Sequence, residues 1–416
     1  MRLRITYTII ALCLGLTAQA QRHCIHSDRI ATLQVVANND WLLPPVIRLG
    51  TRDVLNIGFD DLTHTYHRYT YTITHCEADW SESTELFTSD YLAGFQNGET
   101  IDDYEESINT NQLYNHYRLH IPNDRCAIKM SGNYRLDVFD DESGDTMLTA
   151  RFYVVEPIVN TSISVLGNTD IDNRHSHQQM DLRIDYPASL QATDPRRQFT
   201  VKIQQNERTD NMKVCPPAPR LTNGSMIWTH CRDLIFDGGN EYHKFEFLDP
   251  HRNSLGVESV SWDGEMYHVN VFHDYERRSY VYDEDANGAF YVRNSDNVEN
   301  DITTDYAMTH FYLDTPPLPG DVFIEGKWTL NTLSDKYLME YDEDGKCYHI
   351  ALPLKMGYYS YQYLFIPDGS DESRTCPTEG NFYQTENKYT VFTYFRGNID
   401  RTDRLVGAKT VNYKCN

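Results

Sequence analysis

Alternation of apolar and polar positions runs through most of this chain. Within residues 69–76, every second position carries an aromatic, aliphatic or imidazole side chain, and the positions between them are threonine or cysteine. Similar runs, rich in Tyr, Phe, Val and Thr, lie at residues 134–138, 244–247, 359–365 and 389–395. A period of two that is cut by Asn, Asp, Gly and Pro is typical of half-buried strands. We therefore expect an all-β protein made of tandem immunoglobulin-like β-sandwich domains.

The spacing of strands and turns predicts three domains. The first covers residues 21–157, and the second covers residues 158–300. Residues 294–304 are polar and poor in strand pattern, so we expect a linker there. The third domain, residues 301–416, resembles an early-set immunoglobulin module. Each domain has an ordinary size for a sandwich.

The N-terminus has the pattern of a secretory signal peptide. Arg2 and Arg4 precede an apolar stretch at residues 5–17, which is too short to span a bilayer comfortably. Small residues follow and end at Ala20. We expect cleavage between Ala20 and Gln21, removal of residues 1–20, and a mature protein that is not itself inserted in a membrane.

Composition narrows the range of partners. The chain has 61 acidic and 37 basic residues and a formal net charge of −24, which argues against nucleic acid as a partner. The nine cysteines are widely spaced without a Cys-x-x-Cys pair, so a structural zinc site has no support. Cys215 and Cys231 flank a turn-rich stretch and could pair across it as a disulfide.

No residue set indicates catalysis, a cofactor or a metal. Asp60 and Asp61 are neighbours on a predicted strand, so their side chains point to opposite faces and cannot converge on one bond. Residues 283–288 begin like a calcium loop, but position twelve is Asn294 where the loop needs Glu. Asn287-Gly288 between strand-like runs instead predicts a hairpin turn. Nucleophile-elbow, phosphate-loop and kinase signatures are absent from the sequence, and we expect a protein that is not an enzyme.

One dense run of residue choices resembles a known family. It contains Phe59-Asp60-Asp61-Leu62, Tyr69-x-Tyr71-x-Ile73-x-His75-Cys76-x-x-Asp79-Trp80, Tyr104-x-x-Ser107-x-Asn109-Thr110 and Ser131-Gly132-Asn133-Tyr134. Trp41-x-Leu43-x-Pro45 precedes it, and Glu379-Gly380-Asn381-Phe382-Tyr383 lies near the C-terminus. Together, in this order and spacing, these pieces resemble the type IX secretion system plug protein family, most densely its N-terminal domain.

The resemblance implies a periplasmic protein without enzymatic activity or cofactor. Its implied partner is the large outer-membrane β-barrel translocon of that secretion system, whose periplasmic opening it would close. The family supplies no contact residues. Because functional residues concentrate on loops, we expect contact at the ends of the first domain, where Trp80, Asn109 and Thr110 lie.

A second interpretation is a carbohydrate-binding or surface-glycan protein that uses the third domain. Residues 322–328, which end at Trp328, and the strand pattern at residues 389–395 look like early-set modules that bind glycans. Sugar binding of this kind needs exposed aromatic rings near Trp328, so the exposure of that ring separates the two interpretations.

Overall fold

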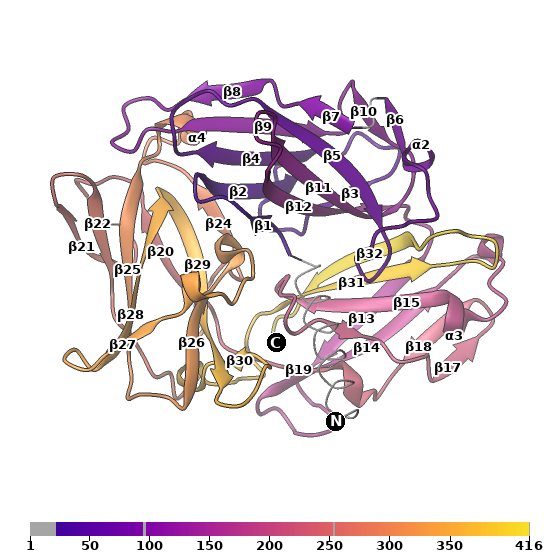
Figure 1. Cartoon of the computed structure of the whole chain (residues 1–416). Coiled ribbons are helices and arrows are strands. Elements are labelled where there is room, and N and C mark those ends of the chain that lie inside the picture. The colour runs from indigo at the N-terminus through magenta and orange to yellow at the C-terminus, as the bar shows by residue number, and fades with distance from the viewer. Residues whose placement is uncertain (1–21, 95–96, 253, 416) are drawn as a thin grey trace, which may run out of the picture.

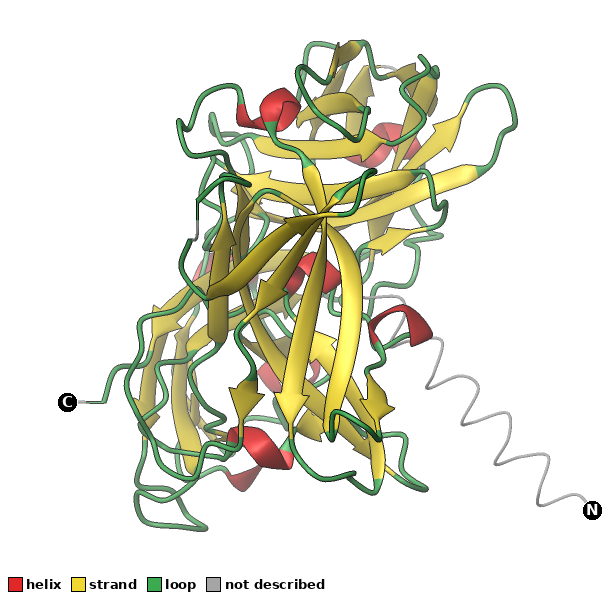
Figure 2. Ribbon diagram, turned by 90° about the vertical axis from the view of Figure 1, so that its left-hand side faces the viewer, coloured by secondary structure: helices red, strands yellow, loops and turns green. Residues whose placement is uncertain are grey.

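The computed structural model describes residues 22–94, 97–252 and 254–415 of the chain. Three β-sandwiches meet around a common centre (Figure 1). Helices are short turns between strands (Figure 2), as in α2 (Thr88–Tyr91), α3 (Pro195–Gln198) and α4 (Asn300–Thr303). The expected all-β sandwich fold is confirmed. In the described ranges no helix has the length and apolar character needed to cross a membrane.

The first sandwich lies at the top of Figure 1 and encloses one apolar core. Its larger sheet consists of β1 (Cys24–Ile25), β12 (Thr146–Val155), β11 (Gly132–Asp140), β5 (Tyr69–Cys76) and β7 (Asn97–Thr100), with β3 (Val46–Arg48) beside β12. The other sheet consists of β2 (Ile30–Ala37), β4 (Leu55–Asp61), β9 (Asn115–Ile121) and β8 (Asp103–Glu106). A short pair, β6 (Leu92–Gly94) and β10 (Cys126–Ile128), lies at one end. As its period predicts, β5 turns Tyr69, Tyr71 and Ile73 into the core.

The second sandwich contains the last two strands of the chain. One sheet consists of β13 (Asn160–Leu166), β14 (His177–Asp185), β18 (Ser225–Trp228) and β17 (Arg220–Thr222), with β19 (Ile235–Asp237) beside β14. The other consists of β16 (Lys213–Val214), β15 (Phe199–Gln205), β31 (Lys388–Phe395) and β32 (Arg404–Asn412).

The third sandwich is built from the chain between those parts. One sheet consists of β20 (His243–Phe247), β29 (Gly357–Pro367), β24 (Phe290–Val292), β26 (Gly320–Glu325) and β30 (Arg374–Thr375). The other consists of β21 (Val257–Trp262), β22 (Tyr267–Val271), β25 (Tyr306–Asp314), β28 (Cys347–Lys355), β27 (Glu340–Asp342) and β23 (Asp274–Tyr275).

The sheets divide the chain differently from the boundary expected at residue 300. Strands β20 to β24 precede that residue but belong to the third sandwich, and β31 and β32 follow it but pair with β15 of the second. The third sandwich is therefore inserted between β19 and β31 of the second. The alternating sequence pattern identifies a strand but not the strand with which it pairs. The insertion of the third sandwich into the second therefore cannot be predicted from that pattern. The polar stretch at residues 294–304 holds α4, whose Ile302 is buried.

Strand β31 is buried along its whole length. Tyr389, Val391 and Phe395 enter the core of the second sandwich, while Phe392 and Tyr394 pack against the first. The yellow pair β31 and β32 accordingly lies between these two sandwiches in Figure 1. A C-terminal strand thus sits at the centre of the molecule.

A turn forms at Asn287-Gly288, but the expected hairpin does not, because the residues before the turn form no strand. Both residues have positive φ, 50° and 80°, which Asn and Gly tolerate best. Only the downstream flank forms a strand, β24, and it pairs with β29. Lys244 Nζ binds Asp283 Oδ1 at 2.6 Å, so a lysine occupies the carboxylate that a calcium ion would need. Across the described ranges, no group of three His, Cys, Asp or Glu side chains is placed to hold a metal.

Asp285→Asn is expected to stabilise the protein above pH 7 by about 1–3 kcal/mol. Burial raises the pKa of Asp285 to about 7, although the backbone N–H groups of Asn287 and Tyr242 bind the carboxylate. A raised carboxyl pKa gives stability that is complete below the unfolded value near 4 and is lost as the pH rises through about 7. An Asn side chain carries no charge, but its Oδ1 accepts only one of the two N–H groups, and the lost hydrogen bond offsets part of the gain.

Urea unfolding at pH 4 and pH 8 measures this difference. Asp283→Asn is the control, because it removes a carboxylate two residues before Asp285 whose side chain is 58% exposed. A lower free energy of unfolding for Asp285→Asn at pH 8 would contradict the expectation.

Candidate functional site

Asp60 and Asp61 at the end of β4 point to opposite sides, as the strand pattern predicts. Asp61 lies inside the first sandwich and accepts a hydrogen bond from the Tyr69 hydroxyl at 2.6 Å. Asp60 faces the third sandwich, where Lys355 Nζ donates at 2.8 Å and the Tyr306 hydroxyl at 2.6 Å. Both carboxylates are 0% exposed. They are two separate buried partners of other side chains and not an acid pair that works on a substrate.

The contact between Asp60 and Lys355 joins the first and third sandwiches. Burial alone would raise the pKa of Asp60, but Lys355 and His116 outweigh it and hold the pKa below its usual value. His116 Nδ1 lies 2.7 Å from Asp60 Oδ1. The carboxylate is therefore charged, and the ammonium group of Lys355 compensates its charge.

A second buried cluster lies at the end of the third sandwich nearest the second. Glu379 accepts the backbone N–H of Tyr363 at 3.0 Å, pairs with Arg277, and lies 3.1 Å from His243 Nε2. His243 Nδ1 lies 2.8 Å from Asp274 on its other side. The imidazole is thus held between two carboxylates. Glu379 is 2% exposed, so this arrangement offers no access for a substrate.

The charges in this cluster shift each other's titration. Burial would lower the pKa of His243, but Asp274 and Glu379 outweigh it and raise the pKa to about 9. Burial would raise the pKa of Glu379, but His243 and Arg277 lower it to about 2. These shifts mark a structural ion cluster inside the fold.

Trp80, expected at a partner contact, is instead buried between the first and second sandwiches. It is 4% exposed, and its ring meets Tyr153 edge to face at 5.2 Å. Phe392 and Tyr394 of β31 belong to the same cluster. The loop after β5 folds onto the second sandwich, so the ring is closed off from any partner in this arrangement. The sequence placed Trp80 in a loop but could not show what covers that loop.

Asn109 and Thr110 lie in the loop at residues 107–114, between β8 and β9. Asn109 is exposed and has a positive φ of 56°. The Thr110 hydroxyl is hydrogen-bonded to Ser107 at 2.9 Å. The backbone N–H of Ile108 donates to the Ile302 carbonyl of the third sandwich at 2.8 Å, and Asp305 binds the next turn of the loop at Asn111. The loop is therefore held in one shape while its tip faces solvent.

The same loop carries apolar side chains that the strand pattern did not single out. Ile108 and Leu113 are each 46% exposed. Tyr66 and Tyr104, which precede this loop in the first sandwich, are exposed as well, with ring centroids 4.9 Å apart. Gln112 Nε2 ties this loop to the loop before β5 through the Leu62 carbonyl at 3.5 Å. We call Tyr66, Tyr104, Ile108 and Leu113 the apolar loop patch. The signal in the sequence was aliphatic residues inside a polar, turn-rich segment.

Acidic residues border the apolar loop patch. Strand β8 is an exposed edge strand that carries Asp103, Glu105 and Glu106. Arg118 of β9 pairs with Glu105 at 2.8 Å and with Asp103 at 3.7 Å, and Glu106 is exposed. Apolar side chains within a charged border are the usual anatomy of a protein interface.

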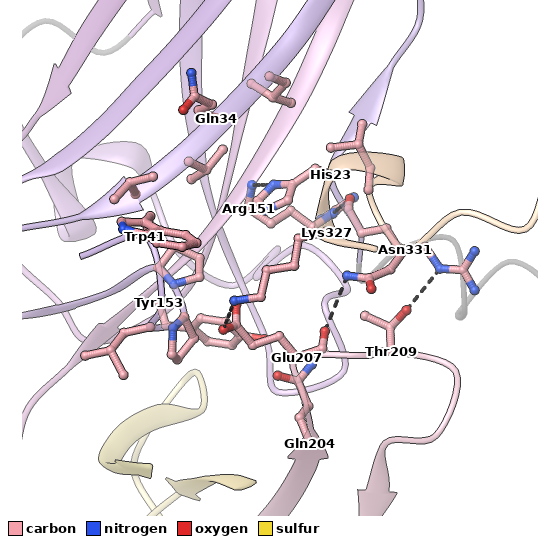
Figure 3. Close-up of a pocket in the computed structure, with 18 of the residues that line it drawn as sticks. His23, Gln34, Trp41, Arg151, Tyr153, Gln204, Glu207, Thr209, Lys327 and Asn331 are labelled. Atoms are coloured by element: carbon pink, nitrogen blue, oxygen red, sulfur yellow. Dashed lines mark hydrogen bonds and ion pairs between the residues drawn. The ribbon is translucent and has the colours of Figure 1, made fainter. Parts of the chain in front are cut away.

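A partly open cavity of about 100 Å³ lies at the junction of the three sandwiches (Figure 3). We call it the central cavity. Arg151 and Tyr153 of β12 line it from the first sandwich. Gln204 and Glu207 line it from the second, and Lys327 lines it from the third. Glu207 and Lys327 form an ion pair across the junction at 2.5 Å.

Two other expected features can be located. Cys215 and Cys231 border the same core in the second sandwich but are not joined, and each described cysteine is a free thiol. Burial raises the pKa of the Cys215 thiol above its usual value, so it is an unreactive group. The expected cleavage site at Ala20 and Gln21 lies outside the described residues.

The features that suggested glycan binding are covered. Trp328 is 8% exposed, its ring stacks on Phe311, and its N–H donates to the Ser360 carbonyl at 3.1 Å. The strand at residues 389–395 belongs to the second sandwich and is buried on both faces. Neither offers an exposed ring to a sugar.

Comparison with known proteins gives one family and one closely similar structure. The family model described as type 9 secretion system plug protein, first domain, matches residues 30–156. The crystal structure of a hypothetical protein from Parabacteroides merdae, at 2.30 Å resolution, is 40% identical. It superposes with a TM-score of 0.90 over 94% of this chain and 99% of that chain. No curated protein matches the chain.

The more distant structures do not share the overall fold of this chain. The C-terminal domain of the Streptococcus agalactiae AgI/II polypeptide BspA is 8% identical, with a TM-score of 0.17 over 91% of this chain and 98% of that chain. The C-terminal domain of the Streptococcus pyogenes antigen I/II-family protein AspA is 8% identical, with a TM-score of 0.18 over 92% of this chain and 99% of that chain. The family model matches the first sandwich, in agreement with the resemblance seen in the sequence, and this part of the chain belongs to the family of type 9 secretion system plug protein first domains.

Proposed function

We propose that this protein is a non-enzymatic periplasmic plug that binds the outer-membrane translocon of the type IX secretion system and seals its periplasmic opening. The observation that carries the proposal is the plug-family domain at residues 30–156, on which the exposed apolar loop patch lies. The expected signal peptide supports a periplasmic location. The buried groups are engaged with each other, which supports a role in binding over one in catalysis.

A seal over a wide pore has to resist deformation. The first and third sandwiches are joined by the buried pair of Asp60 and Lys355. The first and second are joined where Lys202 Nζ donates to the Ala78 carbonyl at 2.6 Å and Asp403 accepts the Ala78 N–H at 3.0 Å. Such a preorganised body loses little conformational freedom when it binds.

Closure of a secretion pore also has to be reversible. An interface with a few apolar anchors and a charged border suits that need, because its affinity depends on a small number of side chains. The apolar loop patch has this composition. Its acidic border and the net charge of −24 favour a partner surface with basic residues around an apolar depression.

The double variant Ile108→Asp/Leu113→Asp is expected to fold normally but to bind the translocon weakly. Both side chains are about half exposed, so the fold does not depend on them, whereas two carboxylates in an apolar contact should weaken binding by about tenfold or more. Co-purification from solubilised outer membranes measures binding. In a strain that lacks the gene, uptake of a large antibiotic measures sealing.

Ile399→Asp is the matched control, because Ile399 is 94% exposed on the second sandwich, away from the apolar loop patch. It should restore the seal as the wild type does. If deletion of the gene leaves antibiotic uptake unchanged while the translocon is present, the plug function is wrong. If deletion causes leakage but Ile108→Asp/Leu113→Asp seals normally, the plug function stands and the contact surface is wrong.

A further inference from the structure

A second, partly open cavity of about 120 Å³ lies between the first and third sandwiches, beside the central cavity. We call it the β2 cavity, because Ile30 and Leu33 of that strand line it from the first sandwich. Phe290, Trp328 and Leu330, together with the end of β28, line it from the third. Except for Phe290, which is half-buried, these five side chains are buried. The cavity therefore reaches the interior of the protein.

The polar groups in the wall of the β2 cavity are engaged within the protein. Lys355 Nζ and the Tyr306 hydroxyl both donate to Asp60. The N–H of Trp328 donates to the Ser360 carbonyl at 3.1 Å. A ligand in the cavity therefore meets mainly apolar atoms. Pockets that bind small molecules are usually lined in this way.

The charges at the rim of the β2 cavity cancel each other. Asp28 and Lys336 are the charged residues of its lining that are exposed, and they have opposite signs. Deeper in the wall, burial raises the pKa of Tyr337 to about 12, as expected for apolar surroundings. Although the chain has a net charge of −24, the cavity favours neither a cation nor an anion.

The strand that gives the cavity its name has an irregular backbone at this point. The pairing of β2 with β4 shifts in register between Ala31 and Gln34. Thr32, inside that bulge, has a φ of 51°, a conformation that a β-branched residue rarely adopts. Its hydroxyl lies 2.5 Å from that of Tyr306 in the third sandwich. Bulges and strained backbone are concentrated next to binding sites, and Ala31 and Thr32 both line this cavity.

We propose that the β2 cavity is a binding site for a small uncharged apolar ligand, up to about the size of a benzene ring. An apolar cavity of about 150 Å³ engineered in another protein stays dry and binds benzene, and the β2 cavity is of similar volume. Because its walls come from two sandwiches, the ligand contacts both and stabilises their junction. Binding at this site does not depend on the plug function.

Titration of the full mature chain with benzene tests this site. Calorimetry should show saturable binding with a Kd of about 1 mM. At ten times the Kd, the melting temperature should rise by about 2 °C. Benzoate, whose carboxylate finds no partner inside the cavity, should bind about tenfold more weakly or worse. No saturable binding of benzene, or binding of benzoate as tight as that of benzene, would overturn the proposal.

Two variants assign the binding to the β2 cavity. Ala31→Leu fills it from β2 and should abolish benzene binding, whereas Ala127→Leu, the same substitution at an exposed position of β10, should leave binding unchanged. Leu354→Ala enlarges the cavity from β28 and should make indole, which is larger than benzene, bind about tenfold more tightly than it does to the wild type. Benzene binding that persists in a folded Ala31→Leu variant contradicts the assigned site. If Ala31→Leu does not fold, Leu354→Ala decides, and indole binding equal to that of the wild type contradicts it.

Discussion

Replacing Lys355 with Met is expected to lower the free energy of unfolding by about 3–5 kcal/mol. The ammonium group is the cation that compensates Asp60, and the two side chains are 1% and 0% exposed. Without it, Asp60 keeps only the Tyr306 hydroxyl and His116 as partners inside the protein. An uncompensated buried charge is among the largest single effects that a substitution produces. Denaturant unfolding followed by tryptophan fluorescence measures the loss.

The double variant Asp60→Asn/Lys355→Met separates charge from packing. Because it removes both charges, it should recover most of the stability lost in Lys355→Met. Arg183→Met, at an exposed arginine, should change the free energy of unfolding by less than about 0.5 kcal/mol. If Lys355→Met costs under about 1 kcal/mol, water reaches the junction between the first and third sandwiches, and the rigid contact inferred there is wrong.

His243→Gln is expected to cost about 3 kcal/mol at pH 6 and much less at pH 9.5. The folded protein raises the pKa of His243 from 6.5 to about 9. The stability that this gives is therefore complete below pH 6.5 and is lost as the pH rises through 9. Glu379, whose pKa falls from 4.5 to about 2, behaves in the opposite sense. Its contribution is complete above pH 4.5 and is lost as the pH falls through 2.

Free energies of unfolding measured between pH 3 and pH 10 test this pattern. The wild type should be most stable between about pH 4.5 and 6.5, and His243→Gln should flatten the decline on the alkaline side. His251→Gln, at an exposed histidine, should follow the wild-type profile. Parallel profiles for His243→Gln and the wild type would show that the imidazole is not charged in the folded protein.

The strands of this fold could be predicted from the sequence, because each has a short-range signature. Residues 69–76 and 359–365 alternate as strands do, and the structure places their aromatic faces in the cores. The sheet partners could not be predicted. The pattern at residues 389–395 is the same whether the strand joins its neighbours in sequence or pairs with β15, as it does. That choice depends on contacts between distant residues.

Only part of the candidate site could be predicted, because its surroundings also depend on contacts between residues that are distant in the sequence. Loop chemistry placed Asn109 and Thr110 at an exposed end of the first sandwich, where they lie. Their part in a contact remains a prediction. Trp80 has the same loop signature, yet β31 from the far end of the chain covers it.

The position of β31 and β32 has a consequence for the order in which the protein folds as the chain emerges from its N-terminus. One edge of β15 pairs with β16, but its other edge has its partner only when residues 388–395 arrive, after the whole third sandwich. Until then the second sandwich is open, and the face of the first sandwich around Trp80 is bare. The last strands of the chain therefore close two apolar surfaces in one step. A chain that ends before residue 388 should be a substrate for proteases and chaperones, even though its first sandwich contains every strand it needs.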